Sequence, residues 1–165
     1  MMMTLWRLSN GSSLAGGAHP GGRWVCAGAN VVLLDATPLA AICARLALAE
    51  AEHPRRLPRG YQLLEVKVPR RGVLRRAAPG NWRSDIAVSR EFGQNWFDSG
   101  ASLLLEVPGL SGAPQYLLNC SHPDLARCKV ISSSQAPFSP HTDALAGMFD
   151  EQRDWLAKPP VVDRA

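Results

Sequence analysis

Apolar residues recur along the chain in short runs that polar and turn-forming residues interrupt. Runs of four to eight residues rich in Val, Leu and Tyr, bounded by Gly, Pro, Asn or Ser, are typical of strands. The first strand ends at a Ser-Asn-Gly turn and the fourth ends at a Pro-Gly step. Strands are predicted at residues 4–8, 30–34, 61–68, 102–107, 115–119 and 128–132.

Three other segments follow helical spacing. Thr37 and Pro38 supply an N-cap and a first helical residue, and the apolar residues after them recur at i, i+3, i+4 and i+7 up to a helix end near Glu52. A second helix is predicted over 84–99, with Gly100 as its C-terminal stop. A third amphipathic helix is predicted after residue 142. Its apolar face is formed by Leu145, Met148, Phe149, Trp155 and Leu156.

Helices and strands are mixed without strict alternation, which favours an α+β fold with a compact mixed, largely antiparallel sheet and flanking helices. A length of 165 residues is the size of one domain. We expect one domain over residues 1–141 and a C-terminal helical extension and tail over 142–165. The role of this extension is open between covering the domain and forming a homodimer contact.

Composition excludes several classes of protein. Apolar residues make up 46% of the chain and charged residues 19%, which are globular values. No run of 18 apolar residues and no secretory h-region occurs, so we expect a cytoplasmic protein without a membrane span. The four cysteines lack metal-ligand spacing, so no metal site is predicted and each is expected to be a small buried side chain.

The net charge of +4 is spread unevenly along the chain. Residues 1–82 hold eleven Lys and Arg against four Asp and Glu, whereas residues 83–165 hold seven against ten. The basic excess is concentrated in residues 55–76, where no aromatic side chains alternate with the arginines as a nucleic-acid surface would require. We therefore do not expect nucleic-acid binding except through a partner, and interpret the basic stretch as a solvated face.

Two arginines lie in unusual surroundings. Arg7 interrupts the apolar run Leu-Trp-Arg-Leu, and Arg23 follows two glycines and precedes Trp24. A charge in or beside a strand is costly to bury unless it meets an anion, and the planar guanidinium fork suits phosphate or carboxylate. From general principles, an anionic ligand and an intramolecular salt bridge are equally good explanations.

Several short segments follow one another along the chain. They are the LWRLS segment at 5–9, GGRW at 21–24, VVLL at 31–34 with Thr37-Pro38, LP at 57–58 with YQLLE at 61–65, Trp82, SLLL at 102–105 with Val107-Pro108, and YLLN at 116–119 with HPD at 122–124. In order and spacing, this series resembles the RES domain over about residues 4–140, and all of its segments are collinear with the family pattern.

The resemblance implies a bacterial toxin of a toxin–antitoxin pair, with a fold similar to that of ADP-ribosyltransferase toxins. Such domains cleave the nicotinamide–ribose bond of NAD+ with phosphate or water as acceptor, acting as NAD+ phosphorylase or glycohydrolase. NAD+ is then the substrate or ligand and no separate cofactor is implied. The implied partner is a helix-turn-helix antitoxin whose C-terminal segment blocks the site.

Carried over residue by residue, the resemblance assigns substrate binding to Arg7, Arg23 and Asn119. The reactive positions are not kept, because the family's aromatic hydroxyl, helix Glu and loop Ser fall on Leu33, Ala44 and Gly109. Ser111 could partly replace the missing hydroxyl. Two alternatives follow: a toxin-family enzyme acting weakly on NAD+, or a catalytically inactive module that binds NAD+, ADP-ribose or an antitoxin.

Overall fold

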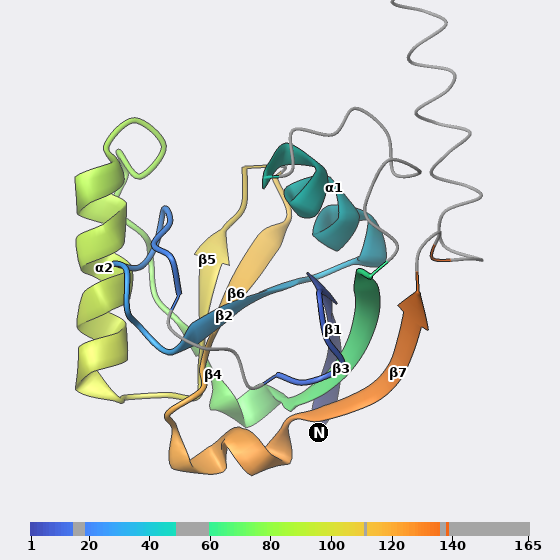
Figure 1. Ribbon diagram of the computed structural model, residues 1–165. Helices are drawn as coiled ribbons and strands as arrows, with labels where there is room; N and C mark the ends of the chain where they lie inside the picture. Colours follow the sequence, from blue (N-terminus) through green and yellow to red (C-terminus); the bar gives the residue numbers. More distant parts are fainter. Residues whose placement is uncertain (15–18, 49–59, 111, 136–137, 139–165) are drawn as a thin grey trace, which may run out of the picture.

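The computed structural model describes residues 1–14, 19–48, 60–110, 112–135 and 138. Its strands form one seven-stranded sheet in the order β4-β5-β6-β2-β1-β3-β7, and two helices flank this sheet (Figure 1). The elements in chain order are β1 (Met2–Ser9), β2 (Val31–Asp35), α1 (Pro38–Leu48), β3 (Gln62–Pro69), β4 (Val73–Arg75), α2 (Ile86–Ser99), β5 (Leu104–Pro108), β6 (Pro114–Asn119) and β7 (Lys129–Gln135). Short 3₁₀ helices occupy 70–72 and 123–127.

The predicted fold class is confirmed: the domain is α+β and its sheet is largely antiparallel. Every pairing in the sheet is antiparallel except that of β4 with β5. β1 pairs with β3 along its whole length, from Met2 opposite Pro69 to Ser9 opposite Gln62. Its pairing with β2 is confined to one position, Trp6 opposite Asp35. The sheet therefore consists of two well-paired halves that meet at a single point.

Alternating side chains along the strands divide the core between the two faces of the sheet. One face carries a cluster that includes Leu5, Leu34, Leu64, Leu104 and Leu118, all of them fully buried. The other face is covered by the helices. Together these clusters fix both helices to the half of the sheet that each one covers (Figure 1).

Each helix packs on a different half of the sheet. Ala41 and Ile42 of α1 pack with Leu8 of β1. Trp96 of α2 packs with strand residues of the other half, including Leu117. Two aromatic side chains of the loops, Trp24 and Trp82, join this second cluster, with ring centroids 5.4 Å apart.

The helix ends follow the predicted cap chemistry with one change. Thr37 Oγ1 accepts a hydrogen bond from the Ala40 amide at the start of α1, as predicted. At α2 the N-cap is Asp85, one residue after the predicted start at Ser84, and its carboxylate accepts from the amides of Ala87 and Val88. Gly100 ends α2 in the left-handed conformation with a φ of 61°, as predicted.

Three sequence predictions were wrong in detail. β4 was missed, because three residues flanked by arginines carry no period and pair in parallel with a distant strand. Leu39 is exposed, and the face of α1 that meets the sheet centres on Ala41 and Ile42. Of the four cysteines predicted to be buried, only Cys128 is, since Cys26 is exposed and Cys43 and Cys120 are half-buried. The predicted helix within 142–165 lies outside the described residues, so the two-part domain division stays a prediction.

Candidate functional site

The single contact between β1 and β2 opens a gap in the hydrogen-bond ladder of the sheet. If the pairing of Trp6 with Asp35 continued, Leu8 would face Leu33, but the two strands part before that position. We call this position the β1–β2 opening and define it by Leu8 and Leu33. Strand carbonyls left without a ladder partner need other donors.

Two arginines supply those donors. Arg7, from β1, donates from Nη1 to the Leu33 carbonyl at 3.3 Å. Arg45, from α1, donates from Nη2 to the Leu8 carbonyl, also at 3.3 Å. The guanidinium of Arg45 lies over the ring of Tyr61, 4.8 Å from its centroid. Side chains from a strand and a helix thus converge on one opening and cap its two carbonyls.

The surroundings of Arg7 affect both its hydrogen bonding and its pKa. Its Nε is buried and has no hydrogen-bond partner in the part of the chain that the structure describes. Burial lowers the pKa of the Arg7 guanidinium, and the neighbouring charge of Arg45 lowers it further, while Cys120 and Asp35 act in the opposite direction. Among the described residues, no Asp or Glu forms an ion pair with Arg7 or Arg45. Within the described part of the chain, the opening is therefore a positively charged site whose charge is incompletely compensated.

The other titratable groups around Arg7 do not remove this imbalance. Burial, helped by the charge of Arg7, lowers the pKa of His19 and so favours its neutral form. Asp35 is buried and its carboxylate accepts a hydrogen bond from Gln115 Nε2 at 3.0 Å. Burial raises the pKa of Asp35 although Gln115 and Arg7 oppose that effect. Its carboxylate thus offsets only part of the arginine charge.

Arg23 has a different environment from Arg7. Its Nη1 donates to the carbonyls of Trp82 and Arg83, at 2.9 and 3.1 Å, and its guanidinium lies 5.8 Å from the Trp82 ring centroid. These contacts fix the loop 19–30 to the segment before α2. None of the contacts described for Arg23 involves Arg7, so its assignment to a ligand stays a prediction.

The same loop is held by α2 through three consecutive carbonyls. Arg90 Nε donates to the Gly22 carbonyl at 2.6 Å, and Ser89 Oγ donates to the Arg23 carbonyl at 2.6 Å. The Trp24 carbonyl lies against Gly93, where a Cβ atom would overlap it. The loop that carries His19 toward Arg7 is thereby set in place by one face of α2.

The positions that depart from the family pattern lie in several surroundings. Leu33 is half-buried on β2, and its carbonyl is the one that Arg7 binds. Ala44 is half-buried on α1, next to Arg45. Gly109 lies in the β5–β6 turn, where its amide donates to the Ala113 carbonyl at 3.0 Å. Ser111, the possible substitute hydroxyl, lies outside the described residues.

Asn119 is buried at the end of β6, and its side chain is used within the fold. Its Oδ1 accepts from the Ser121 amide at 2.9 Å and its carbonyl accepts from the His122 amide at 3.1 Å. Both bonds shape the turn that follows β6. Its assignment to substrate binding stays a prediction, since no ligand contact tests it.

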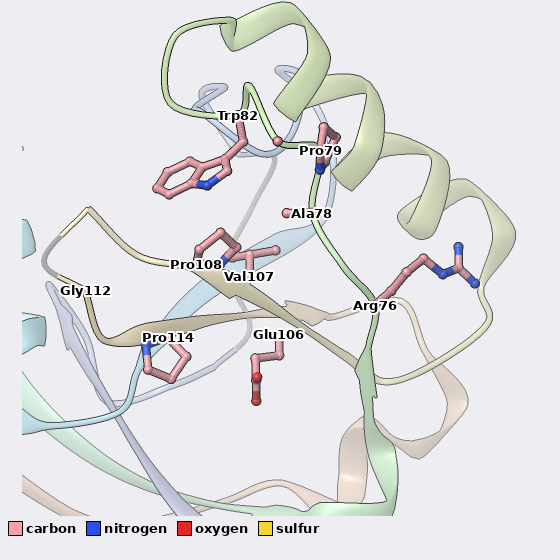
Figure 2. Close-up of a pocket in the computed structure, with 10 residues that line it drawn as sticks. Arg76, Ala78, Pro79, Trp82, Glu106, Val107, Pro108, Gly112 and Pro114 are labelled. Atoms are coloured by element: carbon pink, nitrogen blue, oxygen red, sulfur yellow. The ribbon is translucent and has the colours of Figure 1, made fainter.

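A separate shallow hollow of about 510 Å³ lies between the β5–β6 hairpin and the segment before α2. Figure 2 shows Trp82 and Pro79 on one side of it, with Val107, Pro108 and Pro114 on the other. Arg76 points away from the hollow, and Glu106 is bound to Arg75 at 3.0 Å. The residues that line it include neither Arg7 nor Arg45, so this hollow is distinct from the β1–β2 opening.

Sequence reasoning missed Arg45. It is the one charged residue in the otherwise apolar segment 38–48, which is the signal that singled out Arg7 and Arg23. An arginine that is half-buried on a short apolar helix raises the same question of what its charge contacts as one in a strand. Applying that criterion to the helix would have placed Arg45 among the candidates.

The comparisons with known proteins agree with the fold. Residues 4–141 match the family model of the RES domain. A chain in the crystal structure of the M. tuberculosis MbcT–MbcA toxin–antitoxin complex is similar with a TM-score of 0.66 at 14% identity, over 93% of this chain and 90% of that one. No curated protein sequence matches this chain. No described helix is long and apolar enough to cross a membrane. The family model spans most of the chain, and the protein belongs to the RES domain family.

Proposed function

We propose that this RES domain binds NAD+ at the β1–β2 opening and turns it over slowly, as the toxin component of a toxin–antitoxin pair. The observation that carries the proposal is Arg7, a partly buried cation whose Nε has no hydrogen-bond partner among the described residues. Leaving a buried charged donor unsatisfied costs free energy, and a bound phosphate oxygen would remove that cost. A pyrophosphate-bearing substrate fits this requirement.

We expect slow turnover because the protein lacks polar side chains that the reaction would use. Departure of nicotinamide leaves positive charge on the ribose, which a carboxylate or hydroxyl would stabilise. The corresponding positions hold Leu33, Ala44 and Gly109, none of which carries a polar side chain. By analogy with the loss of one stabilising group, the rate falls by two to four orders of magnitude, or about 3–5 kcal/mol of barrier.

The same three positions favour one alternative, a binding module without turnover. In that case the arginine site is retained for NAD+, ADP-ribose or an antitoxin segment, and no bond is cleaved. The enzyme and a module that binds NAD+ share the ligand and differ only in whether nicotinamide is released. This difference makes them separable in one experiment.

A helix-turn-helix antitoxin is the proposed partner, and the cytoplasm is the proposed compartment. Support for the partner comes from the similar fold found in the MbcT–MbcA toxin–antitoxin complex and from membership of the RES family. An antitoxin segment that covers Arg7 would need an acidic or C-terminal carboxylate group to satisfy the same charge. Co-expression with a small protein encoded beside this chain tests the pairing.

The test of function follows NAD+ binding by calorimetry and nicotinamide release by chromatography, with phosphate present and absent. We expect measurable binding and slow release for the wild type, and loss of both for Arg7→Ala. Arg71→Ala, which removes the same charge from an exposed position, serves as the control. Binding without any release selects the module, and an absence of binding rejects both the enzyme and a module that binds NAD+.

A further inference from the structure

We propose that Arg7 and Arg45 together form a clamp for one phosphate group of the ligand, in place of the Arg7–Arg23 pair that the family pattern implies. The inference rests on the proposed function and names the residues that hold its ligand. It assigns a binding role to an α1 residue that the family pattern does not include.

The two guanidinium groups reach the same opening from different elements. Arg7 and Arg45 donate to Leu33 and Leu8, the two residues that would face each other if β1 and β2 continued to pair. Both hydrogen bonds are 3.3 Å long, beyond the usual range for a strong N–H to O contact. A charged oxygen offers each guanidinium a shorter and stronger bond than the strand carbonyl does.

The charges at the opening favour an anion with several acceptor oxygens. Burial lowers the pKa of Arg7, and the like charge of Arg45 lowers it further. The carboxylate of Asp35 is engaged by Gln115 and forms no ion pair with either arginine. The oxygens of one phosphate can accept hydrogen bonds from Nη1 and Nε of Arg7 and from the Arg45 guanidinium at the same time. The negative charge of the phosphate then offsets the repulsion between the two arginines.

The Tyr61 ring also positions the Arg45 side chain before a ligand binds. Its guanidinium rests on the Tyr61 ring, 4.8 Å from the centroid. Stacking on an aromatic face restricts the guanidinium plane without consuming the in-plane N–H donors. The side chain therefore loses less freedom when it binds an anion than a free surface arginine would.

Arg23 is less available than Arg45. Its two bonds to the carbonyls of Trp82 and Arg83 fall within the normal length range. Moving its guanidinium to a ligand would leave both carbonyls without this donor and would loosen the loop from α2. The contacts thus assign Arg23 to the fold and Arg45 to the phosphate.

Titration with ADP-ribose tests the clamp, because this ligand carries the pyrophosphate but has no nicotinamide to lose. Calorimetry compares the wild type with Arg45→Ala, Arg45→Lys and the exposed control Arg71→Ala. We expect affinity to fall about 10- to 100-fold for Arg45→Ala, less for Arg45→Lys, and less than twofold for Arg71→Ala. Thermal unfolding of each variant confirms that it is folded, and Arg45→Lys replaces Arg45→Ala if the latter is not.

The salt dependence of binding separates a charge contact from a structural effect. If Arg45 touches the phosphate, its removal makes the affinity less sensitive to salt, whereas a purely structural role lowers affinity at all salt concentrations alike. Equal affinity of Arg45→Ala and the wild type, or an unchanged salt slope, overturns the clamp. Failure of the wild type to bind ADP-ribose rejects the proposed function instead, so the two failures are distinguishable.

Discussion

Gly93 of α2 lies directly against the main-chain carbonyl of Trp24, so closely that a Cβ atom at position 93 would overlap the carbonyl oxygen. Glycine lets the helix approach the loop 19–30 at this point. The contact lies beside the two hydrogen bonds that Ser89 and Arg90 donate to the preceding carbonyls. Helix and loop therefore form one packed unit.

Gly93→Ala is expected to lower the free energy of unfolding by about 3 kcal/mol, because backbone must move to admit the methyl group. The higher helix propensity of alanine, about 1 kcal/mol, offsets only part of this loss. Chemical denaturation measures the change. Gly80→Ala is the matched control, since nothing lies within 4 Å of the added Cβ and its stability should be unchanged or slightly higher. Equal stabilities for Gly93→Ala and the wild type would contradict the close approach.

Ser89→Ala tests the second contact of the same unit. Ser89 is fully buried and its hydroxyl donates to the Arg23 carbonyl at 2.6 Å. Its removal leaves a carbonyl without this donor, and we expect a loss of about 1–3 kcal/mol in unfolding free energy. The exposed residue Ser12 provides the control substitution to Ala. A loss below the experimental error would show that the loop is held without this bond.

Ala44→Glu combined with Leu33→Tyr is expected to raise nicotinamide release from NAD+ at least about tenfold, since these changes restore a carboxylate and an aromatic hydroxyl. Ala44→Gln with Leu33→Tyr matches the size of the new side chains without the charge and should gain less. The third position cannot be restored as simply, because a Cβ at Gly109 would meet the Ala113 carbonyl. An unchanged rate in both double variants would mean that the scaffold no longer positions NAD+ for cleavage.

Asp35→Asn is expected to stabilise the protein at neutral pH. Burial raises the pKa of Asp35 above its usual value, so the ionised carboxylate opposes folding at every pH above that raised pKa. The amide lacks this penalty and can still accept from Gln115. The gain should shrink as pH falls through the raised pKa and vanish below the usual aspartate pKa. Urea midpoints measured across this range, with the exposed Asp98→Asn as control, decide the sign.

We expect the exposed cysteine to react with an alkylating reagent faster than the buried one. Cys26 is exposed, whereas burial raises the pKa of the Cys128 thiol to about 11. Under mildly alkaline conditions Cys128 therefore holds little thiolate and little access to reagent, so iodoacetamide should label Cys26 first and leave Cys128 unmodified in the native state. Peptide mass spectrometry identifies the labelled sites, and denaturant should expose all four cysteines. Early labelling of Cys128 would contradict its place in the core.

Much of the fold could be predicted from local pattern. The six predicted strands and two described helices all occur, because alternation, turn residues and the Thr37 cap act within a few residues of each other. β4 was not predictable in the same way, since its three residues become a strand only through Leu104 to Glu106 of β5. Pairings between distant segments leave little trace in a short sequence window.

The candidate site was harder to predict than the fold. Arg7 was found because a charge interrupts an apolar strand. The environment of Arg23 could not be foreseen, because its partners are main-chain carbonyls about 60 residues away, and carbonyls carry no sequence signal. The opening that unites Arg7 with Arg45 depends on where β1 and β2 stop pairing, which no local pattern records.

The attachment of residues 22–24 to α2 also bears on how tightly a ligand can be held. A long irregular loop that has to be ordered by its ligand weakens binding by the conformational entropy it loses. Here the helix has already restricted the backbone beside His19 through Ser89, Arg90 and Gly93. The entropic cost of ordering this loop is therefore met when the protein folds and not when the ligand binds. The side of the site that is formed by His19 is preorganised.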